Sequence, residues 1–140
     1  MRRLILLAAL ALSACGKSEE PTSPPPAPEA PINAGQPMDA RGTSPDWGLK
    51  IRGPQLTLNR PNQPDLVATA SGAVIKPGQA SWTGLLPDGQ AMKVTLYASA
   101  CSDGVSEATY KFSAEVVLPD SSPLTGCAGP PAAPPRAAKR

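Results

Sequence analysis

The feature that most limits the fold is a period of two in the apolar residues between positions 46 and 127. In the clearest example, Tyr110, Phe112, Ala114 and Val116 alternate with polar side chains. Successive side chains on a strand point to opposite faces, so this pattern predicts a half-buried strand. No window of ten or more residues carries the apolar stripe of a helix. The sequence therefore predicts an all-β domain.

Further stretches have the same strand character and are separated by Gly-Pro, Pro-Gly and Pro-Asp-Gly turns. They cover residues 47–51, 56–58, 66–75, 80–85 and 92–97. Gly72 interrupts one of them and predicts a bulge. Trp47 and Trp82 fall within the apolar pattern, so we interpret both as core residues. Short strands at this spacing predict a small antiparallel barrel or sandwich.

The first fifteen residues have the order of a secretion signal. Arg2 and Arg3 precede a short apolar run, and small residues lead to Cys15. The run is too short for a membrane-spanning helix, which needs about 20 apolar residues. The segment Leu12-Ser13-Ala14-Cys15 resembles the lipobox of bacterial lipoproteins, in which the cysteine is acylated after cleavage.

We therefore predict that residues 1–14 are a signal peptide and that acylated Cys15 anchors the chain in the lipid bilayer. Gly16, and not an aspartate, follows the cysteine. In enteric-type sorting this favours the outer membrane, with the protein facing the periplasm.

Composition divides the rest of the chain into three parts. Residues 15–45 combine the lipidated cysteine with a Pro-rich, disordered linker, since this part has too few large apolar residues to bury. Residues 46–127 are the β-domain, and residues 128–140 are a disordered basic tail. The chain has 13 Lys and Arg and 11 Asp and Glu, so removing Arg2 and Arg3 leaves 11 of each. A mature chain close to neutral gives no reason to expect nucleic acid as a partner.

Cys101 and Cys127 form an even pair once Cys15 is acylated. In an oxidising compartment such a pair predicts a disulfide, here one that would pin the 101–107 loop to the end of the domain. A reactive thiol or a metal ligand is the alternative. The chain has no histidine, so a zinc site would need an unusual ligand set, and we expect no metal and no cofactor.

Two segments resemble a family of small bacterial envelope lipoproteins of unassigned function. The first begins with Gly42-Thr43-Ser44-Pro45-Asp46-Trp47, and the second joins Cys101-Ser102-Asp103-Gly104-Val105-Ser106 to a later Gly126-Cys127. Val105 and Glu107 replace the Met and Asp usual in that family, and Ser44 and Asp46 its usual Glu and Phe. The resemblance covers about residues 40–128. It implies an extracytoplasmic, disulfide-bonded β-domain and no particular activity.

The residues give little support to catalysis, because the usual general base, histidine, is absent. Asp103 and Glu107 could be paired carboxylates of the glycosidase type, but we interpret Asp103 as a turn former and Glu107 as a solvent-facing residue. We predict a non-enzymatic binding or structural role in the cell envelope.

The first alternative is an inhibitor or immunity lipoprotein against a wall hydrolase such as lysozyme. In that case Ser102, Asp103, Gly104 and Glu107 would form the binding loop. An enzyme acting on wall polymers is the other alternative.

Overall fold

Residues 32–132 are the part of the chain that the computed structural model describes. The predicted signal peptide, the lipidation site Cys15 and most of the predicted linker lie outside these residues, as do the three basic residues of the tail. The described part contains strands and no helix, and so no helical segment that could cross a membrane.

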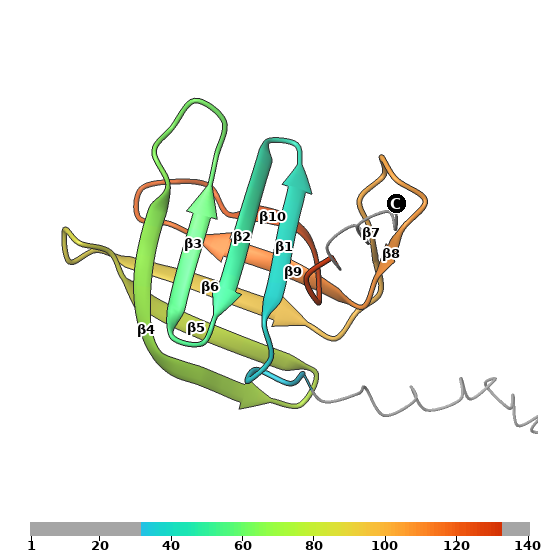
Figure 1. Ribbon diagram of the computed structural model, residues 1–140, viewed down its shortest axis with the longest axis horizontal. Coiled ribbons are helices and arrows are strands. Elements are labelled where there is room, and N and C mark those ends of the chain that lie inside the picture. The colour runs from blue at the N-terminus through green and yellow to red at the C-terminus, as the bar shows by residue number, and fades with distance from the viewer. Residues whose placement is uncertain (1–31, 133–140) are drawn as a thin grey trace, which may run out of the picture.

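Eight of the ten strands form a closed antiparallel barrel (Figure 1). The order around the barrel is β1-β2-β3-β4-β5-β6-β9-β10, so consecutive barrel strands pair, β6 pairs with β9 across the inserted β7 and β8, and β10 closes on β1. The remaining two, β7 and β8, form a separate two-stranded hairpin between β6 and β9. The strands are β1 (Met38–Thr43), β2 (Asp46–Arg52), β3 (Gln55–Asn59), β4 (Leu66–Lys76), β5 (Gln79–Leu85), β6 (Ala91–Tyr97), β7 (Cys101–Ser102), β8 (Thr109–Tyr110), β9 (Phe112–Val117) and β10 (Leu124–Gly129).

The period of two in the sequence matches the burial of side chains. In β2, Trp47, Leu49 and Ile51 are buried, and the residues between them are not. Trp82 on β5 is 1 % exposed and is the largest fully buried side chain, which confirms the prediction that it is a core residue. The inward-facing side chains of all eight strands thus fill the barrel with a packed core.

Strand β4 bends so that it joins the front and back of the barrel (Figure 1). The pairing of β4 with β5 shifts register between Ala70 and Ala73, which confirms the bulge predicted at Gly72. Gly72 has φ of 145°, a value that favours glycine. A bulge of this kind bends a long strand such as β4, which has 11 residues, and helps the sheet to close.

The barrel closes where β1 meets β10. Only three residue pairs form this seam, among them Ala40 with Ala128 and Arg41 with Cys127. Just beyond these pairs, a Cβ added at Gly126 would overlap the carbonyl group of Arg41. A Cβ at Gly42 would likewise overlap the Trp47 indole. Glycine at these two positions allows the first and last barrel strands to come together.

Two boundaries predicted from composition are wrong. The β-domain expected to begin at residue 46 already includes Ile32, which is buried in the core, and Met38–Thr43, which forms β1. In β1 only Met38 is a large apolar residue, so the strand has a composition close to that of a linker. The β-domain expected to end at residue 127 extends further, because Ala128 is buried and β10 ends at Gly129.

Replacing Gly126 by alanine is expected to push β10 away from β1 and to lower the free energy of unfolding by about 1–3 kcal/mol. Urea denaturation followed by tryptophan fluorescence measures the change. Gly48→Ala is the matched control, because a Cβ at Gly48 meets no atom within 4 Å. Equal unfolding midpoints for the two variants would show that the seam tolerates a side chain.

Candidate functional site

The β7–β8 hairpin lies on the outside of the barrel beside β1 and β10 (Figure 1). Cys101 pairs with Tyr110, and Ser102 pairs with Thr109. A disulfide joins Cys101 to Cys127 on β10, as the sequence predicted, with 5.5 Å between the two Cα atoms. The hairpin is therefore covalently fixed to the closing strand of the barrel.

Asp103 organises the tip of this hairpin. Its Oδ1 accepts hydrogen bonds from the backbone N–H groups of Val105 (3.0 Å) and Ser106 (2.8 Å). Its Oδ2 accepts hydrogen bonds from the hydroxyl groups of Ser106 (2.8 Å) and Tyr110 (3.3 Å). Only 1 % of the Asp103 side chain is exposed, so this carboxylate faces its own loop and not a partner molecule.

These contacts stabilise the ionised form of the carboxylate. The backbone N–H groups of Ser106 and Val105 contribute most, and the hydroxyl groups of Ser106 and Tyr110 add to them, against an opposing contribution from burial. Together they lower the pKa of Asp103 from 3.8 to about 2. Asp103 is thus ionised at neutral pH and serves as a hydrogen-bond acceptor that shapes the turn.

The same residue connects the hairpin to β1. The guanidinium of Arg41 lies 3.9 Å from Asp103 Oδ2, and its Cζ is 6.0 Å from the centre of the Tyr110 ring. The Thr43 hydroxyl donates a 3.4 Å hydrogen bond to the Asp103 carbonyl group. These contacts and the disulfide hold the hairpin from two strands, β1 and β10.

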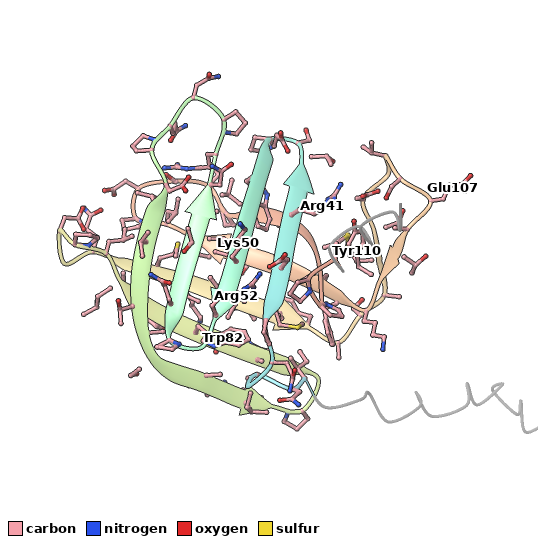
Figure 2. The ribbon with its side chains drawn as sticks, in the orientation of Figure 1. Arg41, Lys50, Arg52, Trp82, Glu107 and Tyr110 are labelled. Atoms are coloured by element: carbon pink, nitrogen blue, oxygen red, sulfur yellow. A yellow bond between two sulfur atoms is a disulfide. The ribbon has the colours of Figure 1, made fainter. Side chains whose placement is uncertain are left out.

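The other residues of the predicted binding loop have separate places. Ser102 Oγ accepts a 3.3 Å hydrogen bond from the backbone N–H of Gly104, which has a positive φ of 70°. Glu107 is exposed and points away from the barrel at the outer end of the hairpin (Figure 2). Asp103 points inward and Glu107 outward, so the structure does not bring the two carboxylates together. A binding role for this loop stays a prediction.

A second feature, which we call the outer groove, lies between this hairpin and the outer surface of β1, β2 and β3 and has a volume of about 640 Å³. Figure 2 shows Arg41 on β1 and Lys50 on β2, with Tyr110 on β8. This groove was not predicted from the sequence, because the pattern of alternating apolar residues did not include β1. Its lining residues are Asp39, Ala40, Arg41, Gly48, Leu49, Lys50, Thr57, Asn59, Asp65, Ala108, Tyr110, Pro130 and Ala132.

The floor of the outer groove consists of two rows of residues across the strands. In one row Arg41 lies opposite Gly48, which lies opposite Asn59. In the next row Asp39 lies opposite Lys50, which lies opposite Thr57. Residues paired across antiparallel strands are about 4.5–5.5 Å apart, and residues two apart along a strand about 7 Å. Arg41 and Lys50 are thus close neighbours of the bare position at Gly48.

No protein-family model, curated protein or solved structure matches this chain. The resemblance to envelope lipoproteins therefore stays a prediction. Within residues 32–132, no group of three or more His, Cys, Asp or Glu residues is placed to hold a metal ion.

Asp103 makes the stability of the domain depend on pH. The folded state holds the Asp103 proton less tightly than the unfolded chain, so this stabilisation is present above pH 3.8 and is lost as the pH falls to about 2. We expect Asp103→Asn to be less stable than the wild type at pH 7, because the amide nitrogen cannot accept the two hydroxyl hydrogen bonds. The difference should shrink as the pH approaches 2.

Chemical denaturation of both proteins at a series of pH values measures this difference. Tyr110→Phe, which removes one hydroxyl donor, is expected to fall between them at neutral pH. If the difference in unfolding free energy between the wild type and Asp103→Asn stayed constant from pH 7 to pH 2, the stabilising role of ionised Asp103 would be contradicted.

Proposed function

We propose that this chain is a lipid-anchored lipoprotein of the cell envelope with a non-enzymatic binding role. The observation that carries the binding role is the outer groove, a concave surface on a barrel whose interior is already filled by side chains. Ligand sites in proteins are concave and largely preformed. The groove has a fixed wall because the disulfide and Asp103 hold the hairpin in place.

The anchor is supported by the sequence before the barrel. Cys15 follows a signal-like segment, and sixteen residues lie between it and the first described residue, Ile32. Two or more acyl chains hold a protein stably on a bilayer, whereas one is marginal. The proposed arrangement is a barrel joined to the outer membrane by a Pro-rich segment and facing the periplasm.

The chemistry around Asp103 favours binding over catalysis. Both of its carboxylate oxygens accept hydrogen bonds from the hairpin, and a general acid or base needs a free path to a substrate. The nearest acid in sequence, Glu107, points the other way. Asp103 therefore shapes the hairpin loop, and Glu107 is part of the hairpin's outer surface.

Crosslinking in intact cells tests the proposal. Cells grown with labelled palmitate are treated with a crosslinker, and the full chain is purified and analysed by mass spectrometry. We expect the label on the wild-type chain together with a crosslinked envelope component. Cys15→Ser is expected to lose the label.

Two results would contradict the proposal. A chain that stays in the cytosol with residues 1–14 intact would exclude the anchor. A labelled chain that crosslinks to no envelope component would exclude the binding role.

A second candidate, an inhibitor of lysozyme-type wall hydrolases, is favoured by the exposed tip of the hairpin. Val105 is 77 % exposed, and Glu107, two residues later, is also exposed. An apolar residue next to an acid at a projecting tip suits insertion into a basic cleft. Asp103 is not available for this purpose, so the inhibitor role would depend on Glu107.

Activity assays of c-, g- and i-type lysozymes with micromolar purified chain separate the two candidates. The leading proposal expects full lysozyme activity. The inhibitor function expects a loss of activity that Glu107→Gln weakens and Lys93→Gln, a change on an exposed residue of β6, leaves as it is.

A further inference from the structure

The end of β4 departs from the alternation of buried and exposed residues seen in β2. Val74 is 59 % exposed, and its neighbour Ile75 is 52 % exposed. Neighbouring side chains on a strand point to opposite faces, so one of the two would ordinarily be buried. Ile75 lies on the face that packs in the core elsewhere, because it pairs with the fully buried Ala80. The strand thus carries two apolar side chains into solvent, one from each face.

This part of β4 lacks a neighbouring strand on one side. β3 pairs with β4 only as far as Thr69, whereas β5 pairs with it to Lys76. The β4–β5 hairpin therefore projects beyond β3. We call residues 74–79 the β4–β5 tip; they read Val-Ile-Lys-Pro-Gly-Gln and contain no acid. On the next strand Tyr97 pairs with Gln79 and is also exposed.

The composition of the β4–β5 tip suits the surface of a phospholipid bilayer. Apolar side chains such as Val74 and Ile75 bind at the boundary between headgroups and acyl chains, with a strength that grows with the apolar area buried. Tyr97 combines an apolar ring with a polar hydroxyl, and residues of this kind gather at the same boundary. Lys76 can bury its alkyl stem and keep its ammonium among anionic headgroups.

The chain enters the barrel at the end that carries this tip. Consecutive barrel strands are antiparallel, so the start of β1, the β2–β3 turn and the β4–β5 tip share one end, which we call the tether end (Figure 1). Ile32, six residues before β1, is buried in the core and fixes the incoming chain to the barrel.

The anchor proposed above would keep the tether end close to lipid. Sixteen residues lie between Cys15 and Ile32, and they span at most about 55 Å. The opposite end of the barrel, the far end, is further away by the length of a strand, about 23 Å for the seven residues of β5. The bilayer is therefore the surface that the β4–β5 tip meets most often.

The two ends of the barrel differ in charge. The far end carries, in its loops and at the start of β2, one base, Arg60, and four exposed acids: Asp46, Asp65, Asp88 and Asp120. At the tether end, segments 32–37 and 53–55 are uncharged, and the tip contributes Lys76. The exposed hairpin acid Glu107 lies away from the tip (Figure 2). An anionic bilayer surface would attract the tether end and repel the far end.

We propose that the β4–β5 tip docks on the phospholipid bilayer to which the chain is anchored, with Val74 and Ile75 at the boundary between headgroups and acyl chains. The tether end then faces the membrane, and the far end faces away from it. This inference rests on the proposed lipid anchor and adds a second contact that orients the barrel. Two apolar residues make a weak contact, and the short tether strengthens it by holding the tip at a high effective concentration beside the lipid.

Brominated phospholipid tests the docking, because bromine on an acyl chain quenches tryptophan only at close contact. The full acylated chain is reconstituted into vesicles of phosphatidylethanolamine and phosphatidylglycerol, and the emission of the wild type is subtracted. Ile75→Trp is the reporter. Leu85→Trp is the matched control, because Leu85 is 59 % exposed and ends β5 at the far end. We expect brominated lipid to quench the added emission of Ile75→Trp and to leave that of Leu85→Trp unchanged.

Two further variants sharpen the test. Val74→Trp is a second reporter and replaces Ile75→Trp if urea denaturation shows that the latter does not fold. Lys76→Glu, added to the reporter, is expected to reduce the quenching, and more so with phosphatidylglycerol than with phosphatidylcholine alone, because it reverses the charge of the tip. Lys93→Glu, which makes the same change at an exposed residue of β6, should leave the quenching as it is.

Equal quenching of Ile75→Trp and Leu85→Trp, or none in a folded tip reporter, would overturn the proposal. A blue shift of the Ile75→Trp emission without quenching would assign the tip to a protein, such as a second copy of this chain, and would also overturn it. Labelled palmitate separates the two levels of inference. A labelled chain that floats with vesicles while its tip stays unquenched keeps the anchor and excludes the docking, and an unlabelled chain excludes both.

Discussion

The contact between β1 and β10 is the constraint on which the rest of the structure depends. Seven of the eight barrel pairings join barrel strands that are consecutive in the sequence once the β7–β8 hairpin is left out. The pairing of β1 with β10 instead joins the two ends of the domain. The seam has room only because Gly126 and Gly42 carry no side chain. Without it, β1 and β10 would be exposed sheet edges, which readily pair with other chains.

The seam also positions the candidate site, since one face of β1 packs in the core and the other contacts the hairpin. Its inward residues, Met38 and Ala40, are part of the core. Its outward residues Arg41 and Thr43 contact the β7–β8 hairpin through Asp103. Arg41 is thus shared by the hairpin and the outer groove, and the groove keeps its shape only while the barrel is closed.

Local patterns predicted the interior of the barrel well. A period of two depends on the residues of one strand alone, so Trp82 and the alternation in β2 could be placed in the core from sequence. The disulfide between Cys101 and Cys127 also followed from residue count and expected compartment. The turn at Asp103 was predictable because Asp-Gly favours a local hydrogen-bonded turn.

The outer groove could not be predicted, because it depends on which strands pair and in what register. Arg41, Gly48 and Asn59 are far apart in sequence, and only the pairing of β1 with β2 and of β2 with β3 aligns them. The strand β1 itself was missed because its inward positions are mostly small. One signal was present in the sequence: Gly48 interrupts an otherwise regular alternating strand without a turn beside it.

The order of the strands has a consequence for how the domain acquires its crosslink. A chain that emerges amino end first displays Cys101 while Cys127, 26 residues later, is still to come. During that interval the Cys101 thiol has no native disulfide partner, and another free cysteine could form a non-native disulfide with it. The remaining cysteine of the chain is Cys15, and its acylation would leave Cys127 as the sole free thiol with which Cys101 could pair.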